Sequence, residues 1–405
     1  MKFLAHFMIL SEKENLCKRK GKNMFPSFSY EMPTRVEFGN GAANRAGEEV
    51  RKIGCSRVLI LSDRGVQKAG LLKKVTDSLD GASVPWELFL DVEPNPKDYN
   101  VSAAAEAVRL MKADCLVAVG GGSPIDCAKG VAIVAAAGGR IRDYEGRFKT
   151  TAVPLPIIAV PTTAGTASEL TFGSVITDTA EKFKFTVKSP LLAPKVALAD
   201  PEMTATMPRS LTAFTGMDAL THAIEAYTCR AATPFSDAPA LVAMELIGKY
   251  LRRAWRDGSD REAREGMLLG SLLAGMAFSH SDVAAVHCLA EALGALYDAP
   301  HGACNSIALP AVMEYSLDSC TERYARVATC LGLNYGSIEE GAAAAVAEVQ
   351  QMARDLELPS LSLFGVREED FEELGCKAEA NLSNPDNPRI LTKDDYVILL
   401  KKLTC

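Results

Sequence analysis

The stretch "VAVGGGSPIDCAKG" (residues 117–130) joins an apolar run to a helix-favouring run through three consecutive glycines. The apolar run has the length of a buried strand. Ser123 suits a helix cap, Pro124 the first helical position, and Asp126 completes a capping pattern. Glycine lets the backbone approach a ligand closely, and a helix N-terminus attracts phosphate oxygens. We therefore predict a pyrophosphate cradle, with a tight strand-to-helix turn as the alternative.

The surrounding pattern predicts two domains. Between residues 24 and 208, short apolar runs alternate with helical stretches such as 101–113, which predicts a parallel sheet; the runs are 57–63, 86–92, 114–121 and 155–161. From residue 209 onward only helical periodicity remains, as in 236–256, 261–279 and 339–355. We expect an α/β dinucleotide-binding domain over 24–208 and an all-helical domain over 209–405, with Ser210 capping the first helix of the second domain.

Composition excludes several classes of protein. The 405 residues carry a net charge of -7, which argues against a nucleic-acid partner. The sequence has no apolar run near the roughly 18 residues that span a bilayer, so we expect no membrane segment. The 11 cysteines are scattered without a C-x-x-C, which is typical of reduced thiols in the cytoplasm. Residues 1–23 resemble translated leader before a start at Met24.

Two further stretches suit a dinucleotide. Asp63 ends the apolar run 57–63, and a carboxylate there can bind a ribose diol and repel a 2′-phosphate, which favours NAD over NADP. It precedes the glycines, whereas the standard dinucleotide fold has the acid after them, so we expect a non-standard Rossmann-like topology. Alone, Asp63 could be a loop carboxylate. The hydroxyl-rich "PTTAGTASELT" (161–171) can wrap a ribose or pyrophosphate, or can be a polar connection.

The chain has only five histidines, and one of them lies in "GMDALTHAIEAY" (216–227). Asp218 and His222 are four residues apart in a helical run and therefore share a helix face. That spacing suits a divalent metal, although a plain intrahelical hydrogen bond is the commoner explanation for such a pair.

Two more histidines follow in "VHCLAEALGALYDAPHG" (286–302). His287 lies in a helical run, and His301 follows Ala-Pro, where the next helix is expected to begin. Three imidazoles with one carboxylate suit Fe(II), Zn(II) or Mn(II) and leave a position for a substrate oxygen.

From about residue 28 to its end, the chain resembles the iron-containing (group III) alcohol dehydrogenases. Ordered motifs in both halves carry the resemblance, among them "PTRVEFGNGA", "GGGSPIDCAKG", "PTTAGTASELT", "GMDALTHAIEAY" and "HCLAEALGALYDAPHG". The resemblance implies a dehydroquinate synthase-like fold, with a cleft between the two domains. It also implies NAD(H)-dependent interconversion of a small primary alcohol and its aldehyde, and a homodimer or higher homo-oligomer.

The resemblance also implies roles for particular residues. The metal, iron or else zinc or manganese, would be held by Asp218, His222, His287 and His301. The cofactor would contact Asp63, Asn95, Gly121, Gly122, Ser123, Asp126, Thr162, Thr163, Thr166 and Lys184. Asp126 and Lys129 match the family pattern in supporting roles.

The sequence departs from the family at two positions. Ala167 stands where glycine is usual, which we expect to be a minor change. Glu291 stands where many members carry a second histidine, one turn after His287. We expect Glu291 to face the metal or the substrate, as a further catalytic residue that disfavours substrates with an anionic group close to the reacting carbon and favours neutral or cationic ones; the alternative is a helix-surface glutamate.

Other functions remain open on the sequence alone. They are a dehydroquinate synthase-type lyase that uses NAD and a metal, a metal-free reductase, and a non-catalytic cofactor-binding assembly protein.

Overall fold

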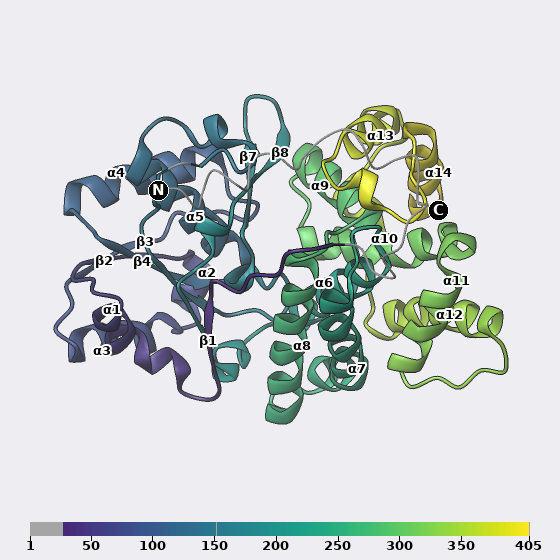
Figure 1. The fold of residues 1–405 in the computed structure, drawn as a ribbon, viewed down its shortest axis with the longest axis horizontal. Coiled ribbons are helices and arrows are strands. Elements are labelled where there is room, and N and C mark those ends of the chain that lie inside the picture. The colour runs from purple at the N-terminus through teal and green to yellow at the C-terminus, as the bar shows by residue number, and fades with distance from the viewer. Residues whose placement is uncertain (1–26, 151, 405) are drawn as a thin grey trace.

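The computed structural model describes residues 27–150 and 152–404, so the predicted leader 1–23 lies outside the described residues. A sheet-containing half and a helical half lie side by side (Figure 1). The main sheet has the order β1-β9-β6-β4-β2-β3, and every neighbouring pair is parallel, as predicted. Its strands are β1 (Arg35–Phe38), β2 (Val58–Leu61), β3 (Trp86–Phe89), β4 (Cys115–Gly120), β6 (Ile157–Pro161) and β9 (Val196–Ala199).

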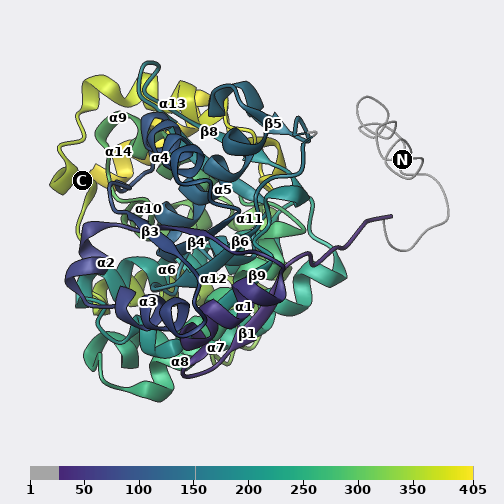
Figure 2. The ribbon, with the colours of Figure 1, turned by 90° about the vertical axis from the view of Figure 1, so that its left-hand side faces the viewer.

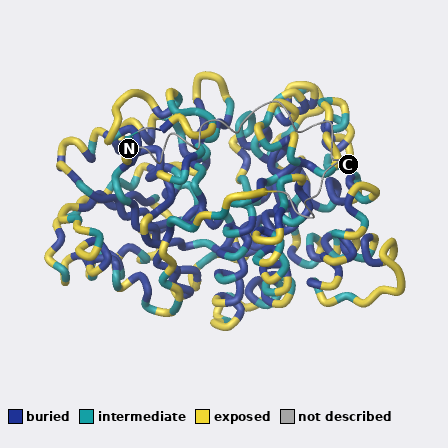
Figure 3. The backbone as a smooth tube through the Cα atoms, viewed as in Figure 1, coloured by how far each residue is buried: buried dark blue, intermediate teal, exposed yellow. Residues whose placement is uncertain are grey.

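Helices cover both faces of this sheet because alternate strand residues face opposite ways. Leu59, Leu116 and Ala118 pack in one core with α4 (Asp98–Met111) and α5 (Gly122–Ala137). Ile60 and Val117 pack in the other with α1 (Ala46–Lys52) and α3 (Leu72–Gly81). The two helical layers lie above and below the strands in Figure 2, and the central strands are buried along their length (Figure 3). Both faces being covered explains why these strands are uniformly apolar.

The helix after the glycines begins earlier than predicted. Gly122 is the first residue of α5 and Gly121 takes the cap position with extended backbone, so Ser123 lies inside the first turn and does not cap the helix. A Cβ on Gly120 would come within 2.4 Å of the Pro124 ring. The Pro124 ring therefore occupies the space that a side chain at position 120 would need.

A second, smaller sheet was not predicted. It has the order β5-β8-β7 and comprises β5 (Gly146–Arg147), β7 (Gly173–Asp178) and β8 (Phe183–Lys188). It lies between the main sheet and the helical half, where β8 contacts α9 (Ala285–Tyr297) (Figure 1). This sheet therefore forms one wall of the space between the two halves.

From residue 209 onward the described chain is helical, as predicted. Helix α6 (Arg209–Thr228) is buried on nearly all sides, because α7 (Pro234–Arg256), α8 (Arg261–Ser279) and α10 (His301–Tyr315) pack around it. Ser210 does not cap α6; Pro208 precedes the helix and no side chain caps it. The remaining helices are α11 (Leu317–Cys330), α12 (Ile338–Asp355), α13 (Phe371–Glu379) and α14 (Lys393–Thr404).

Two general predictions agree with the described residues. The helices of residues 27–404 include none with the length and apolarity needed to cross a bilayer. The cysteines among the described residues are free thiols.

Candidate metal and cofactor site

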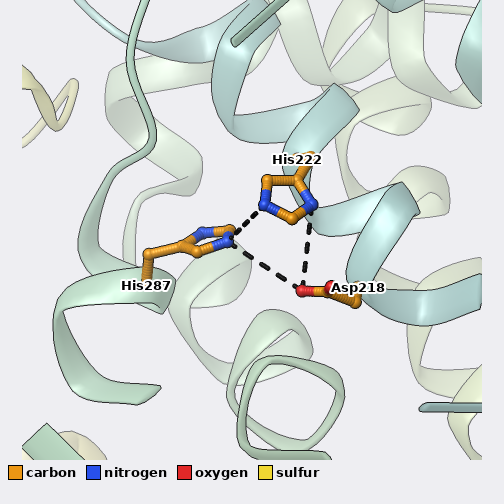
Figure 4. Close-up of side chains that lie close together, drawn as sticks. All are labelled: Asp218, His222 and His287. Atoms are coloured by element: carbon orange, nitrogen blue, oxygen red, sulfur yellow. Dashed lines mark hydrogen bonds and ion pairs between the residues drawn. The ribbon is translucent and has the colours of Figure 1, made fainter. Parts of the chain in front are cut away.

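Asp218, His222 and His287 meet in the buried interior of the helical half (Figure 4). The first two come from adjacent turns of α6, and His287 comes from the first turn of α9. The Nε2 atoms of the two histidines lie 2.9 Å apart. The Asp218 Oδ1 atom lies 3.8 Å from His222 Nδ1 and 4.0 Å from His287 Nε2.

His301 completes the group. It is the first residue of α10, as predicted, and its Nε2 atom lies 4.0 Å from Asp218 Oδ1. Its ring centroid lies 5.4 Å from that of His287. The fold thus brings together all four residues that the resemblance implies as metal ligands.

Glu225 is a buried neighbour that the sequence analysis missed. Its carboxylate accepts hydrogen bonds from His287 Nδ1 at 2.5 Å and from the backbone N–H groups of Ala284 at 2.9 Å and Val286 at 2.7 Å. Because Nδ1 donates to Glu225, Nε2 is the ring nitrogen available to bind a cation, and it lies beside His222 Nε2 and Asp218 Oδ1. Glu225 lies three residues after His222 on the same helix face, which is the signal that could have identified it.

Asn305, one turn after His301, was also missed. Its Nδ2 atom lies 2.6 Å from Asp218 Oδ1, 3.0 Å from His287 Nε2 and 3.1 Å from His301 Nε2. One atom in reach of three candidate ligand atoms shows that those atoms converge on a common point.

Burial shifts the pKa values of the four candidate ligands and so sets their charges. It raises the pKa of Asp218 to about 6, and it lowers the pKa of His222 and of His301 well below the usual range. Burial also acts to lower the pKa of His287, but Glu225 and Asp218 raise it above its usual value. His222 and His301 are therefore neutral near pH 7, the form in which imidazole donates a lone pair.

This arrangement fits a divalent cation. Three imidazoles and one carboxylate converge, and His222 Nδ1, His301 Nδ1 and Asn305 Oδ1 are buried without a hydrogen-bond partner. Buried polar atoms are normally satisfied, and a cluster that leaves several unpaired points to an ion or water among them.

A cleft of about 1300 Å³ leads from this group to the sheet. Both halves line it, the helical half through residues such as Phe214 and His301. The predicted cofactor residues that line it are Asp63, Asn95, Gly121, Gly122, Ser123, Thr162, Thr163 and Thr166.

The sheet order explains why Asp63 precedes the glycines in sequence. Strand β2 pairs directly with β4, so Asp63 and the glycine loop lie at neighbouring strand ends. Asp63 also caps α2 (Arg64–Lys68) by accepting from the Val66 N–H at 2.9 Å. In the glycine loop, a Cβ on Gly122 would lie 2.8 Å from Thr166 Cγ2, so a side chain at this position would collide with the threonine. The spatial relation between acid and glycine loop is that of the standard fold, reached in the opposite chain order.

Asp126 and Lys129 lie behind the cleft and hold the hydroxyl-rich loop. The Lys129 ammonium is fully buried and donates to Ser168 Oγ and Thr171 Oγ1, each at 2.8 Å, and to the Gly173 carbonyl at 2.7 Å. Asp126 accepts from Ser168 Oγ and from the Val175 N–H. Asp126 does not line the larger cleft, but it lines the smaller inner cavity.

Within the same loop, Ala167 has a φ of 47°. This left-handed conformation favours glycine, so the departure from the family pattern strains the backbone and is not minor.

Lys184 and Glu291 line a second, inner cavity of about 230 Å³, together with His222, His287 and His301. This cavity shares His301, Asn95, Gly122, Ser123 and Thr166 with the larger cleft. Lys184 donates to Asn95 Oδ1 at 2.7 Å, and Glu291 accepts from Asn381 Nδ2 at 2.7 Å. Burial raises the pKa of Glu291, although Lys184 acts against it. Glu291 therefore lines the cavity beside the histidines and is not a helix-surface residue.

Known proteins match most of the chain. The family model for iron-containing alcohol dehydrogenase matches residues 33–201, and the model for the C-terminal part of that family matches residues 212–404. The NAD-dependent methanol dehydrogenase of Bacillus methanolicus is 38% identical over 373 residues, which cover 91% of this chain and 98% of that protein. The 1,3-propanediol dehydrogenase of Klebsiella pneumoniae is 41% identical over 367 residues, 88% of this chain and 95% of that protein.

The fold agrees with these matches. A crystal structure of 1,3-propanediol oxidoreductase superposes with a TM-score of 0.91 at 39% identity, covering 93% of this chain and all of that one. The chain therefore belongs to the iron-containing alcohol dehydrogenase family.

Proposed function

We propose that this chain is a metal-dependent, NAD(H)-linked oxidoreductase that interconverts small primary alcohols and aldehydes by hydride transfer. Residues 24–208 would form the cofactor domain and residues 209–405 the metal domain. The observation that carries the proposal is the convergence of one carboxylate and three histidines, Asp218, His222, His287 and His301, beside a cleft whose other wall is the glycine loop. The names of the methanol and propanediol dehydrogenases support it.

The four converging residues would hold the metal, with iron favoured by the family and zinc or manganese as alternatives. When bound there, the cation would draw electron density from a substrate oxygen, which eases removal of an alcohol proton and activates an aldehyde carbonyl. Glu225 would keep His287 oriented through its hydrogen bond to Nδ1. Glu291 would lie beside the reacting group, within the inner cavity.

The sheet half would bind the dinucleotide. Gly121 and Gly122 leave room for the pyrophosphate at the N-terminus of α5, and the hydroxyls of Thr162, Thr163 and Thr166 would surround it. Asp63 would bind the ribose diol, which favours NAD(H) over NADP(H). Asp126 and Lys129 would act indirectly by holding the threonine loop.

The alternatives receive no comparable support. The family models and the named relatives are alcohol dehydrogenases, not lyases, and neither a metal-free reductase nor an assembly protein needs a converging ligand set. We further propose a cytoplasmic homodimer or higher homo-oligomer, in keeping with the free cysteines and the family resemblance.

The test uses purified protein loaded anaerobically with Fe(II), Zn(II) or Mn(II), with NADH consumption measured on butanal. His222→Ala and His301→Ala should lose bound metal and turnover while keeping the wild-type circular dichroism spectrum. His280→Gln is a matched control, because His280 contacts Tyr30 and the Glu31 carbonyl and lines neither cavity. A His222→Ala protein that carries no metal yet reduces butanal at the wild-type rate would point to a metal-free reductase.

A further inference from the structure

One edge of the inner cavity carries a row of polar side chains from β8. Along a strand, alternate residues face the same side. Lys184, Thr186 and Lys188 all line the cavity, whereas Phe185 and Val187 pack into the core behind them. The row begins at Lys184, beside Asn95 and the histidines, and ends at Lys188.

Lys188 has a second cation beside it. In the small sheet, Arg147 of β5 pairs in parallel register with Lys188 of β8, and both side chains line the cavity. Like charges at paired positions destabilise a sheet unless an anion lies between them. Asp282, between α8 and α9, supplies one: its Oδ2 atom lies 2.8 Å from Arg147 Nη2 and 3.4 Å from Lys188 Nζ.

Asp282 does not balance both cations. Its Oδ1 atom is occupied by Ser383 Oγ and by the Val283 N–H, each at 2.9 Å, so a single oxygen serves Arg147 and Lys188. Burial acts to raise the pKa of Asp282, but Lys188, Arg147 and the hydrogen bonds from Ser383 and Val283 together hold the pKa below its usual value. The carboxylate is therefore ionised at neutral pH, and the trio has one positive charge in excess.

The neighbouring charges do not remove this excess. Burial and the Asp282 carboxylate raise the pKa of Asp386, while Arg147, Lys188 and Arg230 act against that rise, so Arg230 shares Asp386 with the two cations. Counting Arg147, Lys188 and Arg230 against Asp282 and Asp386 still leaves one positive charge. Asp126 also lines the cavity, but its Oδ1 atom lies 3.4 Å from the Lys129 ammonium, which balances it. Glu291 lies at the other end of the row, where the positive charge of Lys184 balances its carboxylate.

We infer that Arg147 and Lys188 bind the anionic end of the alcohol or aldehyde substrate, while its reacting carbon lies at the histidine end of the inner cavity. This inference rests on the proposed function and adds a substrate class to it: ω-hydroxy and ω-oxo acids. The expectation drawn from Glu291, that an anionic group close to the reacting carbon is disfavoured, concerns the histidine end of the cavity and stays a prediction.

The strand geometry also sets a length. Four residues at about 3.3 Å each separate the Cα atoms of Lys184 and Lys188 by about 13 Å. The two cationic side chains can reach back along the cavity, but the anion and the reacting carbon are still held well apart. Oxo acids of four or five carbons should therefore be better substrates than glyoxylate, whose carboxylate adjoins the aldehyde.

A purely structural role is the competing explanation, because the Arg147–Asp282 ion pair joins the two halves of the molecule. A structural ion pair would affect all substrates alike when it is broken. A substrate-binding cation would change the preference between an anionic and a neutral aldehyde of the same length.

The experiment compares kcat/KM for 4-oxobutanoate and butanal, with NADH and the metal-loaded enzyme. The wild type should prefer 4-oxobutanoate. Arg147→Gln and Lys188→Met should each lower the ratio of anionic to neutral substrate by about ten- to hundredfold, the loss of one charged hydrogen bond. Asp282→Asn should raise the ratio, because it leaves the cations unopposed. Arg140→Gln, which removes an exposed charge that lines neither cavity, should leave the ratio unchanged.

Binding of succinate, followed by calorimetry on the same proteins, tests the anion site without turnover. Succinate should bind the wild type and bind the Arg147 and Lys188 variants at least tenfold more weakly. The inference is overturned if the wild type prefers butanal, if both variants slow the two aldehydes equally, or if succinate binds all the proteins alike. Failure to turn over either aldehyde would count against the proposed function, and succinate binding would then decide the inference by itself.

Discussion

Replacing Glu225 by glutamine should loosen the candidate metal site without unfolding the protein. Glu225 is buried and accepts three hydrogen bonds, from His287 Nδ1 and from the backbone N–H groups of Ala284 and Val286. Glutamine has nearly the same shape but keeps only one oxygen. Its amide NH₂ group must then face an N–H that previously donated to the carboxylate.

The size of the effect follows from these contacts. A hydrogen bond to a charged group contributes about 1.5–3 kcal/mol, and the substitution loses at least one of them. At about 1.4 kcal/mol for each factor of ten, this corresponds to a loss of roughly ten- to hundredfold, the range found when a partner of a metal-binding histidine is removed. We expect that loss in metal affinity, with a parallel fall in kcat.

The assay is competition between the protein and a chelator for Fe(II) or Zn(II), followed by kcat and by KM for NADH in fully loaded protein. The KM for NADH should stay at the wild-type value, because Glu225 does not line the cofactor cleft. Glu245→Gln, an exposed residue on the adjacent helix α7, controls for loss of one negative charge. Metal affinity within twofold of wild type for Glu225→Gln would refute the reasoning, as would equal losses in the two variants.

Two further predictions concern the sheet half. Asp63→Ser keeps an oxygen to cap α2 but removes the charge that would oppose a 2′-phosphate, so kcat/KM for NADPH relative to NADH should rise at least about tenfold; an unchanged ratio means that Asp63 does not face the ribose. Burial raises the pKa of Glu169 from 4.5 to about 7, so the folded chain holds a proton that the unfolded chain releases, and the free energy of unfolding should fall as pH rises from about 4.5 to about 7. Glu169→Gln should remove that fall and stabilise the protein by up to about 3 kcal/mol above pH 7 in urea unfolding, and parallel pH profiles for the two proteins would exclude this explanation.

Local patterns were sufficient for much of the fold. Apolar periodicity within short stretches of chain predicts the parallel strands β2, β3, β4 and β6 and the long helices. These elements depend mainly on neighbouring residues, so the sequence alone indicates them. The edge strand β1, its buried neighbour β9 and the small sheet were missed. β1 and β5 are short and largely exposed, and such strands are defined by their partners more than by their own composition.

Some contacts of the candidate site could likewise be predicted from local sequence, and others could not. Asp218 and His222 are one turn apart, so helix geometry alone predicts that they are neighbours. Glu225 follows the same spacing but resembles any surface glutamate of a helix, and only its burial reveals its role. Arg147, Lys188 and Asp282 come from three separate segments and are joined by strand register and by packing between the two halves, so no local pattern could predict their contact.

The contacts between the halves also explain how a cofactor bound to the sheet could be placed relative to the histidines. Asn95, in a left-handed conformation at the rim of the cleft, donates to Asp298 Oδ1 at 2.8 Å and to the Ala299 carbonyl at 3.3 Å. Lys97 adds an ion pair with Asp298 at 2.6 Å. Asp298 and Ala299 belong to the short connection between α9, which carries His287, and α10, which begins at His301. The segment that fixes the spacing of two candidate ligands is therefore anchored to the sheet half, and these contacts would hold His287 and His301 at a constant distance from a dinucleotide bound there.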